Sequence, residues 1–232
     1  MELIPVLDLM GGVVVHARRG ARADYRPIQS PLCAGAAPAE VAQALLQLAP
    51  FRTLYVADLD AIAGTGSHDA ALAALAVDHP GLGLWVDAGE GEPERVARRA
   101  AQGPGRPVVG SEAMRDPVSG TAALAVAGAI LSLDYGIEGP RGPAVIHEQV
   151  QLWPQAVIVM TLARVGAGEG PDLDRLRAVM ARAGSRRVFA AGGVRDLDDL
   201  KRLADHGAAG VLLASALHDG RLSPDDIAAF MN

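Results

Sequence analysis

AGGVRDLDDLKRLADHGAAGVLLASALH, residues 191–218, overlays DAGEGEPERVARRAAQGPGRPVVGSEAM, residues 87–114, at a constant offset without a gap. Glycine meets glycine at positions 89 and 193 and at 103 and 207, and serine meets serine at 111 and 215. A second pair, LIPVLDLMGG at 3–12 and AILSLDYG at 129–136, aligns Asp8 with Asp134 near the end of an apolar run. These matches indicate two equivalent halves, at roughly residues 1–125 and 126–232.

The chain alternates short apolar runs with longer segments of helical period, which is the pattern of β–α units around a parallel sheet. Strands are predicted at Leu3–Asp8, Thr53–Asp58, Gly83–Asp87, Pro107–Gly110, Ala129–Asp134, Ala156–Thr161, Arg187–Ala191 and Gly210–Ala214. Helices are predicted at Pro38–Leu48, His68–His79, Glu92–Gln102, Asp116–Ala127, Pro143–Trp153, Asp172–Ala183, Asp196–His206 and from Ser223. Eight units predict one α/β domain over residues 1–232, a (β/α)8 TIM barrel of the ribulose-phosphate-binding type. The alternative is an open doubly wound sheet, which has no need of a repeat.

The composition narrows the classes of partner. A formal net charge of −6 argues against nucleic acid and against an anionic membrane surface, so we expect a small metabolite. Cys33 has no partner for a disulfide, and the N-terminus lacks the features of a secretory signal, so we expect a cytoplasmic protein. The only lysine, Lys201, lies on a helix face expected to be exposed, which argues against Schiff-base and pyridoxal-phosphate enzymes.

Two aspartates are the first candidates for catalysis. Asp8 and Asp134 end predicted strands one and five, so a barrel would bring both to the mouth where active sites of this fold lie. Opposed carboxyl groups can divide acid and base roles when their surroundings separate their pKa values. The alternative is that each aspartate only caps the turn that follows its strand.

A phosphate site is predicted at the loops after strands seven and eight, AAGGVRD and LLASALHDG. Glycines let backbone N–H groups approach a ligand, and a helix start presents unpaired donors to an anion. The alternative is that these glycines only shape tight turns. The long loop from Leu9 to Ala37 is predicted to be a functional lid rather than a disordered insertion. Its His16 and Arg19 are candidate substrate ligands, and the alternative for His16 is a structural residue whose ring is satisfied within the fold.

Five motifs spread over the whole chain carry a family resemblance: IPVLDLMGGVVV, YVADLDAIAG, VVGSEAM, ILSLDYG and AAGGVRDLDDLKRLADHGAAGVLLASALHDG. The chain resembles the histidine-biosynthesis isomerase and cyclase barrels. It is more similar to phosphoribosylformimino-5-aminoimidazole carboxamide ribotide isomerase than to imidazole glycerol phosphate synthase.

The resemblance implies a role for particular residues. Asp8 corresponds to the general base and Asp134 to the general acid of an Amadori-type aldose-to-ketose rearrangement, and Thr161 to a threonine that positions the substrate. One phosphate site is implied at Gly192, Gly193, Ala214 and Ser215. The substrate is then a small phosphorylated metabolite, and neither a metal nor an organic cofactor is implied.

The sequence departs from the family at the loop after strand three, where DAGEGEP replaces a glycine-rich stretch ending in arginine. Asp87, Glu90 and Glu92 are expected to repel a phosphate there. The turn residues Gly89, Gly110 and Ser111 are kept as candidate ligands, so binding of a second phosphate is left open.

The motifs VVHA, with His16 where the isomerase tends to have arginine, and VDAG resemble a related branch of the family. That branch is known chiefly from organisms with tetrahydromethanopterin-linked one-carbon chemistry. The resemblance implies an isomerase-like enzyme acting on a singly phosphorylated, ribosyl-derived metabolite. The alternatives are the authentic isomerase of histidine biosynthesis and a non-catalytic barrel that binds a phosphorylated metabolite or supports a partner enzyme.

Overall fold

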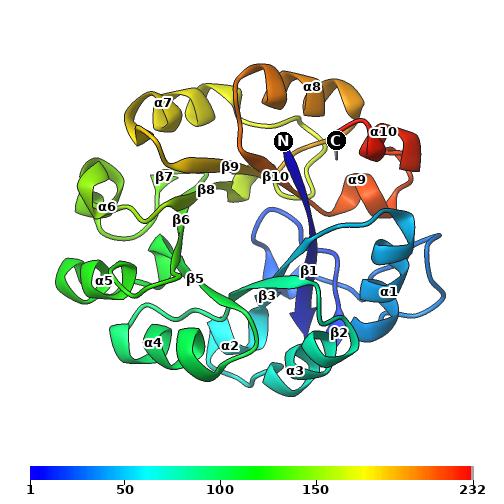
Figure 1. The fold of residues 1–232 in the computed structure, drawn as a ribbon, viewed down its shortest axis with the longest axis horizontal. Helices are drawn as coiled ribbons and strands as arrows, with labels where there is room; N and C mark the ends of the chain where they lie inside the picture. The colour runs from blue at the N-terminus through cyan, green and yellow to red at the C-terminus, as the bar shows by residue number, and fades with distance from the viewer. Residues whose placement is uncertain (231–232) are drawn as a thin grey trace.

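A closed barrel of eight parallel strands is surrounded by helices in the computed structural model, which describes residues 1–230 (Figure 1). The barrel closes because β1 pairs in parallel with both β3 and β10, which excludes an open sheet. The barrel strands are β1 (Glu2–Met10), β3 (Thr53–Asp58), β4 (Gly83–Asp87), β5 (Arg106–Gly110), β6 (Ile130–Gly136), β8 (Ala156–Thr161), β9 (Arg187–Ala191) and β10 (Gly210–Leu213). All eight strands lie where the sequence predicts them, to within two residues at each end.

The helices also follow the predicted pattern. They are α1 (Pro38–Leu48), α2 (Leu59–Ala63), α3 (Asp69–Asp78), α4 (Pro93–Gln102), α5 (Pro117–Leu124), α6 (Ala144–Glu148), α7 (Leu173–Ala183), α8 (Leu197–Asp205), α9 (Ser215–His218) and α10 (Pro224–Ala228). Two short helices beyond the eight predicted ranges, α2 and α9, follow β3 and β10. No helix within residues 1–230 has the length and apolar character needed to cross a membrane.

The helix predicted at 143–153 is shorter than expected. It divides into α6 and a 3-10 turn, Val150–Leu152. The indole N–H of Trp153 donates to the carbonyl oxygen of Ile146 over 2.6 Å. In a continuous helix this carbonyl would accept from Val150 instead, so the indole competes with the helical hydrogen bond.

Alternate residues of each strand face opposite sides of the barrel wall. Ile4, Ile130 and Phe189 belong to the cluster inside the barrel, and their strand neighbours, such as Leu131 and Val188, belong to the layer between strands and helices. On β1 and β6, the residues in phase with Ile4 and Ile130 include Asp8 and Asp134. The strand period therefore directs both carboxyl groups inward.

Side chains seal the N-terminal end of the barrel. Thr53 donates to Oε1 of Glu2 over 2.6 Å, and Arg187 donates to Oε2 of Glu2 over 2.7 Å. Above this layer the rings of Trp85 and Phe189 pack edge to face at 4.9 Å. These side chains occupy the N-terminal end of the barrel, and the cavity lies at the opposite end.

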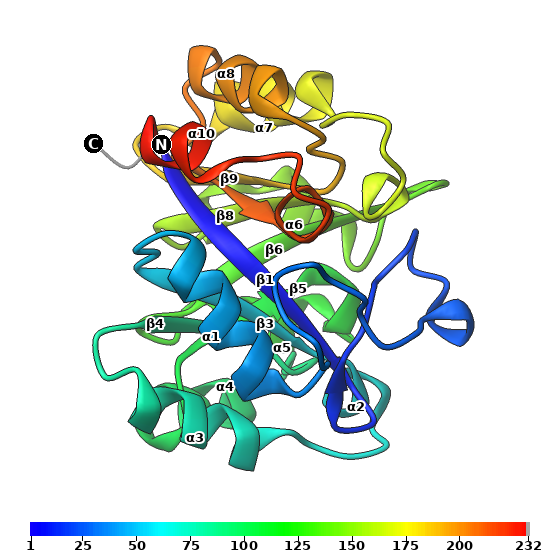
Figure 2. The same cartoon turned by 90° about the vertical axis from the view of Figure 1, so that its right-hand side faces the viewer.

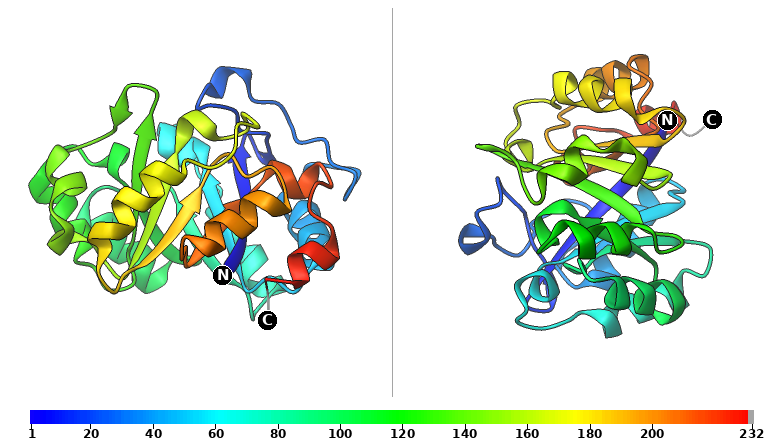
Figure 3. Two further views of the ribbon diagram at one scale, coloured as in Figure 1. Left: turned by 90° about the horizontal axis from the view of Figure 1, so that it is seen from above. Right: turned by 90° about the vertical axis from the view of Figure 1, so that its left-hand side faces the viewer.

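The long loop after β1 lies at that opposite end (Figures 2 and 3). It is ordered by β2 (Val13–Val14), which pairs with β1, and by a 3-10 turn, Arg22–Asp24. It also contacts the loop after β8, because Arg19 N–H donates to the Val165 carbonyl over 2.9 Å. At the far side of the mouth, the short strand β7 (Gly139–Pro140) pairs with the end of β6.

Candidate active site

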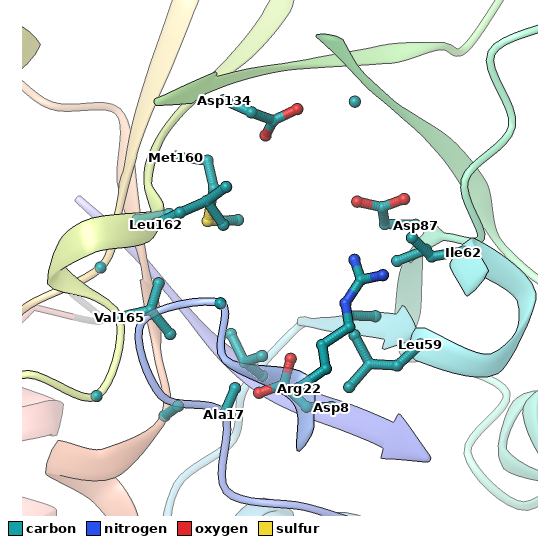
Figure 4. Close-up of a pocket in the computed structure, with 18 of the residues that line it drawn as sticks. Asp8, Ala17, Arg22, Leu59, Ile62, Asp87, Asp134, Met160, Leu162 and Val165 are labelled. Carbon is teal, nitrogen blue, oxygen red and sulfur yellow. The ribbon is translucent and has the colours of Figure 1, made fainter. Parts of the chain in front are cut away.

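A cavity of about 1180 Å³ opens at the C-terminal ends of the strands. Figure 4 shows Asp8 and Asp134 on opposite sides of it, with Asp87 at a third side. Nine of the residues predicted for the site line this cavity: Asp8, His16, Gly89, Gly110, Asp134, Gly192, Gly193, Ala214 and Ser215.

Asp134 is held by three donors and is only 4% exposed. Its Oδ1 accepts from the Ser132 hydroxyl over 2.7 Å, and its Oδ2 accepts from the Ser111 hydroxyl over 3.3 Å and from the Glu112 N–H over 3.1 Å. Burial raises the pKa of Asp134 to about 7, assisted by the charge of Asp87 and opposed by the hydrogen bond from Ser132. A carboxyl group with this pKa can carry a proton at neutral pH.

Asp8 has different surroundings. Its backbone carbonyl accepts from Val15 N–H, which ties the end of β1 to the following hairpin. Burial, and secondly the negative charge of Asp87, raises the pKa of the Asp8 carboxyl to about 7. Near neutral pH, one of the two opposed groups can therefore be protonated while the other is ionised, as acid–base catalysis needs.

Asp87 is a third carboxyl group of the cavity. Its Oδ2 accepts from the Tyr55 hydroxyl over 3.2 Å, and its Oδ1 accepts from the Gly89 N–H over 3.1 Å. Burial raises the pKa of Asp87 to about 6, while the hydrogen bond from Gly89 opposes the increase. The sequence pattern indicates Asp87 only as a group that repels phosphate, and it gives no signal for Tyr55.

The sequence predicts that Asp87, Glu90 and Glu92 all repel a phosphate at the loop after β4, and for Glu90 this prediction is wrong. Glu90 is 6% exposed, and its Oε2 accepts from Arg99 Nε over 2.8 Å. It does not line the cavity, so its charge is neutralised away from any phosphate there. Glu92 does line the cavity, at 3.4 Å from the guanidinium of Arg115.

Gly110 leaves room for two carboxyl groups. A Cβ atom at this position would lie 3.0 Å from Oδ2 of Asp134 and 3.8 Å from Oδ2 of Asp87. The bare glycine therefore keeps open the space into which both oxygen atoms point.

The loops after β9 and β10 have the geometry expected of an anion site. Gly193 has a φ of 90°, and a Cβ atom there would lie 2.3 Å from the Gly170 carbonyl oxygen. Within the described residues, the backbone N–H groups of Gly193, Val194 and Ser215 donate to no other group of the chain. His16 Nε2 is hydrogen-bonded to the Ser215 hydroxyl at 3.1 Å. This contact ties the long loop to the start of α9.

Three of the predicted residues do not line the cavity. Thr161 is 6% exposed and follows Met160, whose side chain enters the cavity instead (Figure 4). The hydroxyl of Ser111 is fully buried and bonded to Asp134, and the guanidinium of Arg19 pairs with Glu169 at 2.6 Å.

Other arginines of the same loop, Arg18, Arg22 and Arg26, line the cavity instead of Arg19. The guanidinium of Arg22 lies 3.7 Å from Oε1 of Glu112 and points toward Asp87 in Figure 4. A polar loop gives no periodic signal that could distinguish these arginines in the sequence.

Comparison with known proteins agrees with this geometry. The chain is 30% identical to an imidazole-4-carboxamide isomerase of Photorhabdus laumondii, with 98% of this chain and 95% of that protein aligned. It is 28% identical to the phosphoribosyl isomerase A of Streptomyces griseus, over 94% of this chain and 92% of that protein. It is also 25% identical to an uncharacterized protein of Methanocaldococcus jannaschii, over 98% of this chain and 97% of that protein.

The family model described as histidine biosynthesis protein matches residues 2–223, which include both opposed aspartates and the loops after β9 and β10. With the barrel closed and these residues at its mouth, the chain belongs to the histidine biosynthesis protein family.

Proposed function

We propose that this protein is an isomerase of the aldose–ketose type, acting on a singly phosphorylated, ribosyl-derived metabolite. The observation that carries the proposal is the pair Asp8 and Asp134. They face each other across one cavity, and both have a pKa raised to about 7. The names of the Photorhabdus and Streptomyces relatives support isomerase activity.

The two carboxyl groups would divide the steps of an Amadori-type rearrangement. Protonated Asp134 donates its proton to the ring oxygen of an N-ribosyl substrate, the C1–O bond breaks, and a protonated imine forms at C1. Ionised Asp8 then removes the proton from C2, which gives an enaminol. Asp8 then returns its proton to C1 while the C2 hydroxyl gives its proton to ionised Asp134, which completes the 1-amino-ketose and restores both groups, so the reaction needs no oxidant and no cofactor.

One phosphate is assigned to the loops after β9 and β10. Support comes from the free N–H groups of Gly193, Val194 and Ser215, which lie in the loops where the barrel fold commonly binds phosphate. Around Gly89 the cavity wall includes Asp87 and Glu92, which disfavour a second phosphate. We further assign the reaction to tetrahydromethanopterin-linked one-carbon or cofactor biosynthesis, on the VVHA and VDAG motifs.

The second candidate is the authentic isomerase of histidine biosynthesis, whose substrate carries two phosphates. Arg95 and Arg115 line the cavity on the side of Gly89, and Glu90 is turned away from it. Both observations favour this candidate, because two guanidinium groups can offset the charges of Asp87 and Glu92.

Turnover of two substrates separates the candidates. One is the glycosylamine formed from ribose 5-phosphate and aniline, which has one phosphate, and the other is the bis-phosphorylated ribotide of the histidine pathway. We expect the protein to convert the singly phosphorylated glycosylamine to its ketose product and to convert the bis-phosphorylated ribotide poorly. 13C NMR measures both conversions. Asp8→Asn and Asp134→Asn should each lower the rate by about 10²–10⁴-fold.

Circular dichroism of both variants checks that they fold. Rapid turnover of the bis-phosphorylated ribotide would favour the second candidate. Unchanged rates in both asparagine variants would remove the acid–base mechanism, and no turnover of either substrate would favour a non-catalytic barrel.

A further inference from the structure

Asp87 is the carboxyl group of the cavity that the proposed acid–base steps do not use. The equivalent position of the second half, 191, is alanine, so the repeat itself does not require an acid here. β4 nevertheless directs the Asp87 side chain into the cavity, in phase with Trp85 inside the barrel.

The carboxyl group of Asp87 is oriented by two donors from different elements. Tyr55, on β3, donates to Oδ2, and the N–H of Gly89, in the loop after β4, donates to Oδ1. Because each carboxylate oxygen can accept two hydrogen bonds, each retains capacity for a ligand. The carboxyl group of Asp87 is therefore fixed in position and still able to accept a hydrogen bond from a ligand.

Space for a ligand lies beside Oδ2 of Asp87. A Cβ atom on residue 110 would lie 3.8 Å from this oxygen and 3.0 Å from Oδ2 of Asp134, so a side chain here would occupy the region beside both carboxyl groups that glycine leaves open. A donor group of a ligand in this region can bind Oδ2 of Asp87, whereas Oδ2 of Asp134 already accepts two hydrogen bonds, from Ser111 and Glu112.

A cation of the chain already faces Asp87. Figure 4 shows the Arg22 guanidinium directed toward it across the cavity, and this positive charge lowers the pKa of Asp87 against the effect of burial. Arg22 is 39% exposed in its side chain and 3.7 Å from Glu112. The surroundings of Asp87 therefore already accommodate a positive charge.

We propose that Asp87 is a specificity-determining residue that binds a protonated nitrogen of the substrate, which makes that substrate an amine-bearing sugar phosphate. The inference rests on one part of the proposed function, the binding of a substrate phosphate by the loops after β9 and β10. The amine donates a charge-assisted hydrogen bond to Oδ2 of Asp87, beside the acid Asp134. The acidic loop after β4 then serves recognition of an amine in place of a second phosphate.

A matched pair of probes tests the inference by calorimetry at pH 7.5. Glucosamine 6-phosphate and glucose 6-phosphate differ in one amino group, and inorganic phosphate reports on the anion site alone. We expect the wild-type protein to bind the amine-bearing probe about tenfold more tightly or better. Asp87→Asn should abolish this preference, because an asparagine can keep the contacts with Tyr55 and Gly89 but has no charge.

The matched control is Glu92→Gln, which removes one carboxyl group from the rim of the same cavity, and it should keep the preference. Equal affinity of the wild-type protein for both probes would overturn the inference, as would a preference that survives in Asp87→Asn. If inorganic phosphate binds but neither sugar phosphate does, the inference about Asp87 is overturned while the phosphate part of the proposed function stands. Failure of all three compounds to bind would overturn the phosphate part of the proposed function as well.

Discussion

Ser111 and Asp134 are joined by two hydrogen bonds between β6 and the turn after β5. The N–H of Asp134 donates to Ser111 Oγ over 2.9 Å, and the Ser111 hydroxyl donates to Oδ2 of Asp134 over 3.3 Å. Ser111 is fully buried, so water cannot replace it without rearrangement. The serine that the sequence suggested as a phosphate ligand thus holds the proposed general acid.

Removing this hydroxyl gives the first prediction. Ser111→Ala leaves the buried N–H of Asp134 without its acceptor and removes one donor from the carboxylate. We expect the free energy of unfolding to fall by roughly 1–3 kcal/mol and the pKa of Asp134 to rise further. Urea denaturation measures the first effect, and 13C NMR of labelled aspartate measures the second. Unchanged values of both would contradict the role assigned to Ser111.

The second prediction concerns stability as a function of pH. The pKa of Asp87 is raised from 3.8 to about 6 in the folded state, so folding favours its protonated form. The stabilisation from this group is present below pH 4 and is lost as pH rises through about 6. Relative to Asp87→Asn, the wild-type protein should therefore lose roughly 2–3 kcal/mol of unfolding free energy between pH 4 and 7.5. Urea denaturation of both proteins at several pH values tests this, and a constant difference would contradict it.

The third prediction concerns the coupling of the three carboxyl groups. Because the charge of Asp87 raises the pKa of both Asp8 and Asp134, Asp87→Asn should lower both pKa values. A 13C NMR titration of the aspartate carboxyl carbons measures the shift, with Asp8→Asn and Asp134→Asn spectra used for assignment. Titration of either group below pH 5 in the wild-type protein would show that burial does not control it.

The barrel was predictable because its strands are short apolar runs that end at turn residues, and all eight were located from this pattern. The same rule, an apolar run ending on aspartate, applies to Asp87 as well as to Asp8 and Asp134. It also applies to Asp58, which accepts from the N–H groups of Ala61 and His68 and does not line the cavity, so the rule alone does not identify the third carboxyl group. The partner of Glu90 was not predictable. Arg99 lies nine residues away on α4, and only the packing of that helix brings the two charges together.

Thr161 shows where a resemblance and a physical pattern disagree. On β8, Val157 and Val159 face the helices and Ile158 faces the barrel interior, so alternation places Met160 inside and Thr161 outside. Thr161 does not line the cavity, so the geometry lends no support to the role that the resemblance implies for it, and that role stays a prediction. The division of α6 could not be predicted either, because it depends on where the indole of Trp153 lies.

The last prediction separates backbone strain from steric fit at the proposed phosphate site. Gly193 and Gly128 have nearly the same φ, 90° and 87°, which alanine adopts only with strain. A Cβ atom on Gly193 would lie 2.3 Å from the Gly170 carbonyl oxygen, whereas one on Gly128 would meet no atom within 4 Å. Both alanine variants should lose about 1–2 kcal/mol of unfolding free energy through strain, and Gly193→Ala should lose more because the loops after β8 and β9 must separate. Only Gly193→Ala should also weaken binding of inorganic phosphate, since its N–H group leaves the site. Equal destabilisation and equal phosphate affinity in the two variants would show that the close approach of Gly193 to Gly170 has no part in forming the anion site.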